Sequence, residues 1–181
     1  MNRAVFLDRD GTLIAEKNYL SRVEDVEILP GTGAALKKLQ SAGYKLFMVT
    51  NQSGIGRGYF TLAEAGRVND CLCQVLAREG VCFEKIYLAP EAPDQPSRGR
   101  KPSPQFLFDA RDEFEIKLAQ SFMIGDKLID LECGWNAGVK CSILVRTGYG
   151  ATLAESGAAA LQRAVVVDDL AGAARKIVGA A

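Results

Sequence analysis

The stretch Val5-Phe6-Leu7-Asp8-Arg9-Asp10-Gly11-Thr12 joins three apolar residues directly to two carboxylates that are one residue apart. The apolar run predicts a strand buried on both faces, as in a parallel sheet. Open α/β sheets hold their ligands at the carboxyl ends of strands, so we expect both acids to face a ligand. Two carboxylates this close repel each other unless a cation or a shared proton lies between them. The stretch is therefore suited to Mg²⁺ and a phosphate ester.

Short apolar runs alternate with amphipathic segments along the rest of the chain, which is typical of an α/β fold with a parallel sheet. Thr61 and Glu64 predict a capping box for one helix, and Ser103-Pro104 predicts the N-cap and first residue of the next. The expected strands are residues 4–7, 45–49, 85–88, 121–124, 141–145 and 165–167. The expected helices are residues 32–42, 62–79 and 104–114, a short helix after Asp130 that ends at Gly138, and residues 169–178.

The length suits one domain with a substantial core, and we expect a single domain over residues 1–181. Its expected fold is α/β, a three-layer Rossmann-like sandwich around a central, mostly parallel sheet. One flap and one helix nearly fill the interval between Thr12 and Thr50, and a helix, a strand and a proline-rich loop nearly fill that between Thr50 and Lys101. Neither interval leaves room for a separate cap domain, so we expect an open site.

The charges of the chain balance, with 22 basic and 22 acidic residues, so no global field draws it to nucleic acid or to an anionic membrane. No apolar run approaches the ~20 residues needed to span a bilayer. Asp8 and Asp10 interrupt the first apolar run, which argues against a signal peptide. We therefore expect a cytoplasmic monomer with no nucleic-acid or membrane partner.

Histidine is absent from the sequence, which excludes Ser-His-Asp hydrolases, Cys-His enzymes and HExxH zinc enzymes. Any general acid or base must then be a carboxylate, Lys, Tyr or Cys. The five cysteines are odd in number, and no pair has the spacing of a zinc site. We interpret them as small apolar residues of a reduced protein.

Reactive side chains also follow two further predicted strands, and another group precedes the predicted helix of residues 104–114. Thr50, before Asn51-Gln52-Ser53-Gly54, either holds phosphate oxygens with nearby N–H groups or caps a turn. Arg100-Lys101 offers cations for phosphate, or is a solvated basic loop. Asp126 ends the fourth strand, and the spacing of Asp130 returns it to the same side of a helix. One of these acids suits a Mg²⁺ ligand and the other its orienting partner, although Asp130 also suits a helix N-terminus.

Taken in order, these elements resemble the haloacid dehalogenase superfamily of Mg²⁺-dependent phosphatases over about residues 4–150. The resemblance implies that Asp8 is the nucleophile, which becomes an aspartyl-phosphate, and that Asp10 is the general acid and then the base. It implies that Thr50 and Lys101 hold the transferring phosphoryl group. The implied Mg²⁺ site comprises the Asp8 carboxylate, the Asp10 main-chain carbonyl and the Asp126 carboxylate, with Asp130 in support.

A narrower set of motifs is similar to those of the D-glycero-D-manno-heptose 1,7-bisphosphate phosphatases and the related histidinol-phosphate phosphatases. The motifs are residues 8–12, 50–58, 100–102 and 125–127. The substrate contacts that this similarity implies are Arg9, Glu16, Tyr19, Asn51, Gln52, Ser53, Arg100 and Lys127. Arg100 would bind the distal phosphate or a sugar oxygen. Many members of that family hold a structural zinc through three Cys and one His before the Arg-Lys-Pro motif, whereas residues 90–99 contain neither here. No zinc is therefore expected, and the prolines of this loop are expected to stiffen it.

The leading hypothesis is a Mg²⁺-dependent phosphatase that acts on a small phosphorylated sugar, at the C7 phosphate of the heptose 1,7-bisphosphate. Histidinol phosphate or another small phosphomonoester is an alternative substrate. The 3′-phosphate of a nucleic-acid end is disfavoured by the zero net charge and the lack of an aromatic-basic stripe. A phospho-accepting receiver module also has N-terminal acids with a Thr and a Lys at strand ends. Receivers do not typically place a second acid as Asp10 stands to Asp8.

Overall fold

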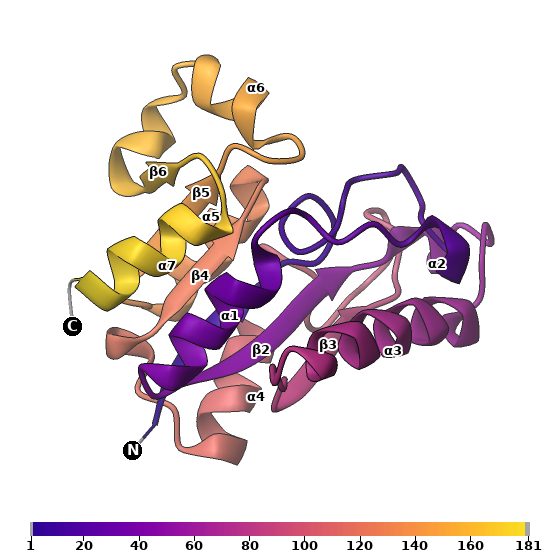
Figure 1. Ribbon diagram of the computed structural model, residues 1–181. Coiled ribbons are helices and arrows are strands. Elements are labelled where there is room, and N and C mark those ends of the chain that lie inside the picture. The colour runs from indigo at the N-terminus through magenta and orange to yellow at the C-terminus, as the bar shows by residue number, and fades with distance from the viewer. Residues whose placement is uncertain (1, 180–181) are drawn as a thin grey trace.

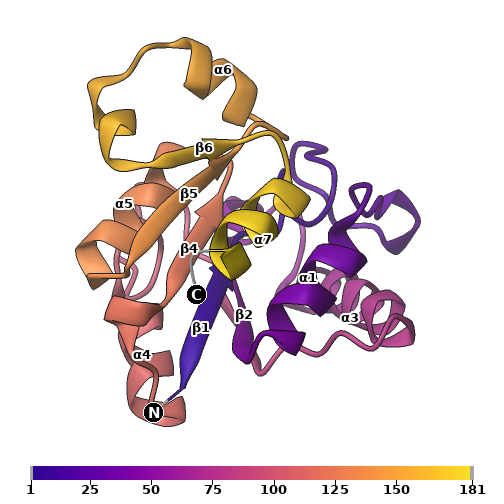
Figure 2. The same ribbon diagram turned by 60° about the vertical axis from the view of Figure 1, so that its left-hand side comes forward.

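A computed structural model describes residues 2–179, which contain a six-stranded sheet whose neighbouring strands are all parallel. The strand order is β3-β2-β1-β4-β5-β6. Figure 1 shows the sheet, and Figure 2 shows β1 inside it, between β2 and β4. The strands are β1 Arg3–Leu7, β2 Tyr44–Asn51, β3 Lys85–Ala89, β4 Phe122–Gly125, β5 Cys141–Val145 and β6 Val165–Val167. All six strands were predicted, and β2 continues past its predicted end to include Thr50 and Asn51.

Helices cover both faces of the sheet and complete the predicted three-layer sandwich (Figures 1 and 2). One face carries α1 Thr32–Ser41, α3 Leu62–Arg78 and α7 Leu170–Gly179, and the other carries α4 Gln105–Phe114 and α5 Leu128–Ala137. Within residues 2–179 no separate cap domain is inserted between these elements.

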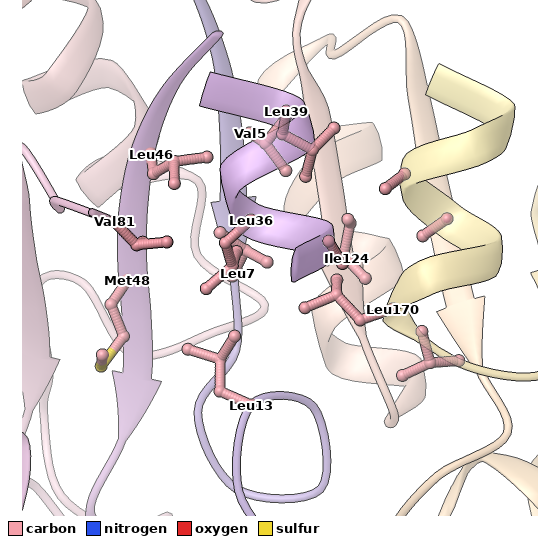
Figure 3. Close-up of a cluster of buried hydrophobic side chains, with 14 of the residues drawn as sticks. Val5, Leu7, Leu13, Leu36, Leu39, Leu46, Met48, Val81, Ile124 and Leu170 are labelled. Atoms are coloured by element: carbon pink, nitrogen blue, oxygen red, sulfur yellow. The ribbon is translucent and has the colours of Figure 1, made fainter. Parts of the chain in front are cut away.

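The alternation of side chains along β1 divides the core into two clusters. Val5 and Leu7 join the cluster beneath α1, α3 and α7, whereas Ala4 and Phe6 join the cluster beneath α4 and α5. All four side chains are fully buried, and burying a Val, Leu or Phe side chain typically contributes about 1.5–3 kcal/mol. Figure 3 shows Leu36, Leu39 and Leu170 of the covering helices packed over Val5, Leu7 and Ile124. The loop that carries Asp8 and Asp10 therefore begins from a strand that is packed on both faces.

The structure corrects some predicted helix ends and adds short elements. Helix α5 begins at Leu128, before Asp130, because the Asp130 carboxylate accepts a hydrogen bond from the Lys127 N–H at 2.9 Å and caps the first turn. Helix α4 begins at Gln105, with Pro104 as N-cap rather than first residue. The capping box at the start of α3 is confirmed. Elements that were not predicted are the helices α2 Ser53–Gly56 and α6 Gly150–Glu155, and the 3₁₀ turns Val23–Asp25, Leu118–Gln120 and Ala159–Arg163.

The register of the sheet brings the carboxyl ends of its strands to one edge. Leu7, the last residue of β1, pairs with Met48 of β2 and with Ile124 of β4. The polar residues that follow these strands therefore start at the same level, as the parallel topology requires. None of the helices in the described part of the chain is both long enough and apolar enough to cross a membrane.

Candidate active site

The loop after β1 folds back at once and presents two carboxylates to one cavity. The Asp8 N–H still donates to the Ile124 carbonyl of β4 at 3.0 Å, so Asp8 is held at the end of the sheet. Gly11 has a φ of +78°, which favours glycine, and the Leu13 N–H donates to the Arg9 carbonyl at 2.8 Å. This tight turn leaves both Asp8 and Asp10 on the cavity wall.

Lys101 is the buried cation of the site. Its Nζ donates to Asp8 Oδ1 and to the Val49 carbonyl, both at 2.7 Å, and lies 2.6 Å from Asp130 Oδ1. Burial alone would lower the pKa of Lys101, but the charges of Asp130 and Asp8 raise it above its ordinary value, so the ammonium stays protonated. The Asn51 side chain fixes the Lys101 backbone by accepting from its N–H at 3.0 Å and donating to its carbonyl at 3.1 Å.

Three buried carboxylates converge beside this lysine. Asp8, Asp126 and Asp130 have oxygen atoms within 4.8 Å of one another, the only such acidic, Cys or His group of three within residues 2–179. Asp126 Oδ2 accepts from the Tyr149 N–H at 2.8 Å, while its buried Oδ1 has no hydrogen-bond partner. Burial and the charge of Asp8 raise the pKa of Asp126 to about 8. An unpartnered buried oxygen among crowded carboxylates fits a hard divalent cation such as Mg²⁺.

Two glycines enclose the Asp126 carboxylate. A Cβ atom at Gly11 or at Gly148 would lie 2.2 Å from Asp126 Oδ2, which no side chain can tolerate. The Thr147 hydroxyl donates to the Gly11 carbonyl at 2.5 Å and ties the two loops together. The loops after β1 and β5 therefore form a rigid cradle for the acid at the end of β4.

Asp10 is held by donors on both of its oxygens. Arg9 Nε donates to Asp10 Oδ2 and Arg9 Nη2 to Asp10 Oδ1, both at 3.1 Å, and Gln52 Nε2 donates to Asp10 Oδ2 at 2.8 Å. Gln52 Nε2 also lies 2.8 Å from Thr50 Oγ1. Arg9 is fully buried, and its third guanidinium nitrogen, Nη1, donates to Asn69 Oδ1 of α3 at 2.8 Å. This network gives the Asp10 carboxylate a defined orientation.

The cavity has a volume of about 220 Å³, and polar and charged groups dominate its wall. On this wall, Lys127 Nζ pairs with Glu16 Oε2 at 2.9 Å and lies 4.8 Å from the centre of the Tyr149 ring. Tyr19, on the flap after β1, packs edge-to-face against Tyr59 at 4.8 Å between ring centres. The lining residues are Asp8, Asp10, Glu16, Asn18, Tyr19, Leu20, Asn51, Gln52, Ser53, Gly54, Arg100, Lys101, Lys127, Ile129, Asp130 and Tyr149.

The cavity thus combines an Asp8–Lys101 ion pair, a cluster of three aspartates and the second carboxylate of Asp10. This arrangement agrees with the matches to known proteins. Residues 3–129 match the family described as polynucleotide kinase 3 phosphatase, and residues 99–173 match the HAD-hydrolase-like family. A D-glycero-beta-D-manno-heptose-1,7-bisphosphate 7-phosphatase of Helicobacter pylori is 44% identical over 145 residues, covering 80% of this chain and 84% of that protein. The chain belongs to the haloacid dehalogenase-like phosphatases, in the heptose bisphosphate phosphatase family.

Other members of the heptose bisphosphate phosphatase family are similar over most of their length. The 7-phosphatase of Haemophilus ducreyi is 42% identical over 157 residues, which cover 83% of this chain and 86% of that protein. A D,D-heptose 1,7-bisphosphate phosphatase from B. bronchiseptica, crystallised with magnesium and phosphate, has a TM-score of 0.90 and 31% identity, with 99% of both chains covered. The predicted fold and the predicted resemblance are therefore both confirmed.

The structure brings most of the predicted site residues of this phosphatase to one cavity. Arg9, Thr50 and Asp126 are predicted site residues that lie behind its wall. Arg9 was expected to contact substrate, but its buried guanidinium is occupied by Asp10 and Asn69. The predicted residues on the wall are Asp8, Asp10, Glu16, Tyr19, Asn51, Gln52, Ser53, Arg100, Lys101, Lys127 and Asp130.

Sequence reasoning missed two residues of this phosphatase site that bear on its chemistry. Tyr149 lines the cavity and its N–H binds Asp126, and a signal for it was present, because Gly148-Tyr149-Gly150 follows the predicted fifth strand. Asn69 holds Arg9, and its signal was a polar residue in the apolar stripe of a predicted helix.

Proposed function

We propose that this chain is a Mg²⁺-dependent phosphatase that removes the C7 phosphate from D-glycero-D-manno-heptose 1,7-bisphosphate. The observation that carries the proposal is the cluster of Lys101 with Asp8, Asp126 and Asp130 at the end of the central strands. The relatives that are similar over most of their length carry the 7-phosphatase name, and this supports the substrate. The polynucleotide match covers residues 3–129, the part with the catalytic strand ends, and the zero net charge gives no support to a nucleic-acid substrate.

In the first step of the proposed reaction, an Asp8 carboxylate oxygen attacks phosphorus. The new Asp8 O–P bond forms as the bond between phosphorus and the oxygen on C7 of the sugar breaks. The proton of Asp10 goes to that leaving oxygen. In the second step, water attacks the aspartyl-phosphate and gives its proton to Asp10. The Asp8 O–P bond breaks, and inorganic phosphate leaves with Asp8 restored. No histidine is needed in either step.

The surrounding residues are suited to hold the charge that develops on the phosphoryl oxygens. Lys101 is fixed by its ion pairs and by Asn51, so its positive charge is in place before the reaction. Asp8, the Asp10 main-chain carbonyl and Asp126 would hold Mg²⁺, which when bound neutralises phosphoryl oxygens as a Lewis acid. Asp130 would hold the Lys101 ammonium in position beside the cluster through its ion pair. Thr50 would act beside Gln52, which its hydroxyl contacts.

The cavity offers two cations for the second phosphate of the proposed substrate. Arg100 and Lys127 both line the cavity, and Lys127 is paired with Glu16. Burial lowers the pKa of Arg100 and so does the charge of Arg57, whereas the charge of Glu91 opposes the shift. A guanidinium on the cavity wall is suited to donate to phosphate oxygens. A small sugar with two phosphates therefore suits this cavity better than a simple phosphate ester.

The other expectations complete the same proposal. We propose that residues 1–181 act as one domain, as a cytoplasmic monomer that uses no zinc and has no nucleic-acid or membrane partner. The loop of residues 90–99 contains neither Cys nor His, which supports the absence of a zinc site of the family kind.

The decisive experiment measures phosphate release from a panel of substrates with and without Mg²⁺. The panel contains both anomers of heptose 1,7-bisphosphate, heptose 7-phosphate, histidinol phosphate and an aryl phosphate. We expect kcat/KM to be highest for a heptose bisphosphate and expect chelation of Mg²⁺ to stop turnover. Preference for histidinol phosphate would overturn the substrate, and sustained activity in rigorously metal-free buffer would overturn the metal site. Single-turnover phosphorylation without steady phosphate release would instead identify a receiver.

A further inference from the structure

A hydrogen-bond clamp holds Arg100 within its own loop. Ser97 Oγ donates to Glu91 Oε2 at 2.6 Å and accepts from the Arg100 N–H at 3.1 Å. Arg100 Nη1 then donates to the Glu91 main-chain carbonyl at 3.0 Å. The clamp, defined as Glu91 and Ser97, therefore grips Arg100 both at its backbone and at its guanidinium.

The rest of the loop is anchored by separate contacts. The Gly56 N–H of α2 donates to the Pro90 carbonyl at 2.8 Å, and a Cβ at Gly56 would lie 2.4 Å from Gln95 Oε1. At the far end, Arg98 pairs with Asp109 of α4, and the Ser103 hydroxyl donates to the Arg98 carbonyl at 3.0 Å. Because these contacts seat the loop on both sides, loss of the clamp would loosen Arg100 more than it would loosen the loop.

A restrained arginine binds an anion better than a free one. A free arginine side chain samples many rotamers, and ordering it before binding removes part of that entropy cost from the binding step. A guanidinium has five N–H donors, and the Glu91 carbonyl occupies only Nη1 in the contact above. Donors therefore remain for a phosphate that enters the cavity that Arg100 lines.

We infer that Glu91 and Ser97 are positioning residues that set Arg100 against the second phosphate, and that they thereby control selectivity for a bisphosphate over a monophosphate. The inference rests on the proposed function, because it takes Arg100 as the contact for the phosphate that does not react. It adds two residues that neither touch the reacting atoms nor line the cavity. Their effect falls on substrate choice and leaves the chemical step unchanged.

The test compares Ser97→Ala with Ser97→Thr, which keeps the hydroxyl, and with Arg100→Ala. Ser103→Ala is the matched control, because the Ser103 hydroxyl donates to the Arg98 carbonyl of the same loop, whereas Ser103 contacts Arg100 through its main-chain N–H, which the substitution keeps. For each variant kcat and KM are measured on heptose 1,7-bisphosphate and on p-nitrophenyl phosphate, which has no second phosphate. We expect Ser97→Ala to raise KM for the bisphosphate about fivefold, the equivalent of one hydrogen bond, and to leave the aryl phosphate within about twofold. Ser97→Thr and Ser103→Ala should resemble the wild type.

The outcomes separate this inference from the proposed function. Selective loss in Arg100→Ala together with wild-type behaviour of Ser97→Ala overturns the clamp and leaves the bisphosphatase intact. Equal losses on both substrates in Ser97→Ala, or no recovery in Ser97→Thr, assign Ser97 a general structural role and also overturn the clamp. Equal losses on both substrates in Arg100→Ala overturn the distal-phosphate role of Arg100, and the clamp with it.

Discussion

Replacing Asp126 by Asn should stabilise the metal-free protein while it removes catalysis. Asp126 is buried with Asp8 and Asp130, and its Oδ1 has no hydrogen-bond partner. An Asn carbonyl can still accept the hydrogen bond from the Tyr149 N–H, and its NH₂ group can then donate toward the neighbouring carboxylates. The substitution thus removes a buried charge and keeps the existing contact, but it removes the charge of a proposed metal ligand.

The size of the effect follows from the raised pKa. The pKa of Asp126 rises from an ordinary value of 3.8 to about 8. At about 1.4 kcal/mol per pH unit, this corresponds to a destabilisation of ~6 kcal/mol when the carboxyl group is ionised. Because Asp8 is coupled to Asp126 and the site can relax, we expect a smaller effect. The unfolding free energy of Asp126→Asn should exceed that of the wild type by about 2 kcal/mol at pH 8. The folded-state pKa lies above the unfolded one, so the folded state binds the extra proton, and the contribution of Asp126 to wild-type stability falls as pH rises from about 4 to 8. The advantage of the variant should therefore be small near pH 4 and largest at pH 8.

Denaturant unfolding at pH 5 and pH 8, in chelator and in Mg²⁺, measures this directly. Mg²⁺ at about 100 times its dissociation constant should stabilise the wild type by about 2.7 kcal/mol and should stabilise Asp126→Asn far less. Asp94→Asn, at an exposed site in the proline-rich loop, is the control for losing one carboxylate. The reasoning is refuted if Asp126→Asn in chelator is no more stable than the wild type at pH 8, or if its advantage does not shrink at pH 5.

Three other substitutions test separate parts of the site. Asp8→Asn should lower phosphate release by at least about 10³-fold with the fold intact by circular dichroism, and substantial residual turnover would remove Asp8 as the nucleophile. Gly148→Ala places a Cβ 2.2 Å from Asp126 Oδ2, an oxygen of a proposed Mg²⁺ ligand, at a φ of +55°, so it should weaken the apparent Mg²⁺ affinity at least about tenfold. A Mg²⁺ titration of activity that matches the wild type would contradict that cradle. Asn69→Ala leaves Arg9 Nη1 without its acceptor, so it should cost about 1–3 kcal/mol of unfolding free energy and lower kcat several-fold at unchanged KM. A rise confined to KM would show instead that Arg9 reaches the substrate.

The sheet and the acidic cluster were predictable because their signals are local. A buried parallel strand is a continuous apolar run, and the residue after it lies at the ligand edge whatever the rest of the fold does. Asp8 and Asp126 could therefore be placed together without knowing the distance between them, whereas Lys101 lies well beyond β3 and was placed by the family resemblance. The short helices α2 and α6 escaped prediction because four and six residues give too little periodicity to recognise.

The direction of individual side chains could not be read from the sequence. Arg9 stands between two site acids, and only the turn at Gly11 and the presence of Asn69 on α3 send it inward. The clamp on Arg100 likewise depends on a loop that brings Glu91 back over Ser97. These contacts join residues that are distant in the sequence or lie in an irregular loop, so helical or strand periodicity does not predict them.

The interior position of β1 has a consequence for how the protein is made. β1 can pair with β2 as soon as residues 44–51 leave the ribosome, but its other edge pairs with β4, which begins at Phe122. Until that residue is synthesised, the strand that ends at Asp8 keeps one open edge, the kind of edge on which chains aggregate. Asp126 follows directly after β4, so the stretch of synthesis that protects the strand also supplies an acid of the proposed cation site. A truncated or stalled product would thus be both inactive and prone to association.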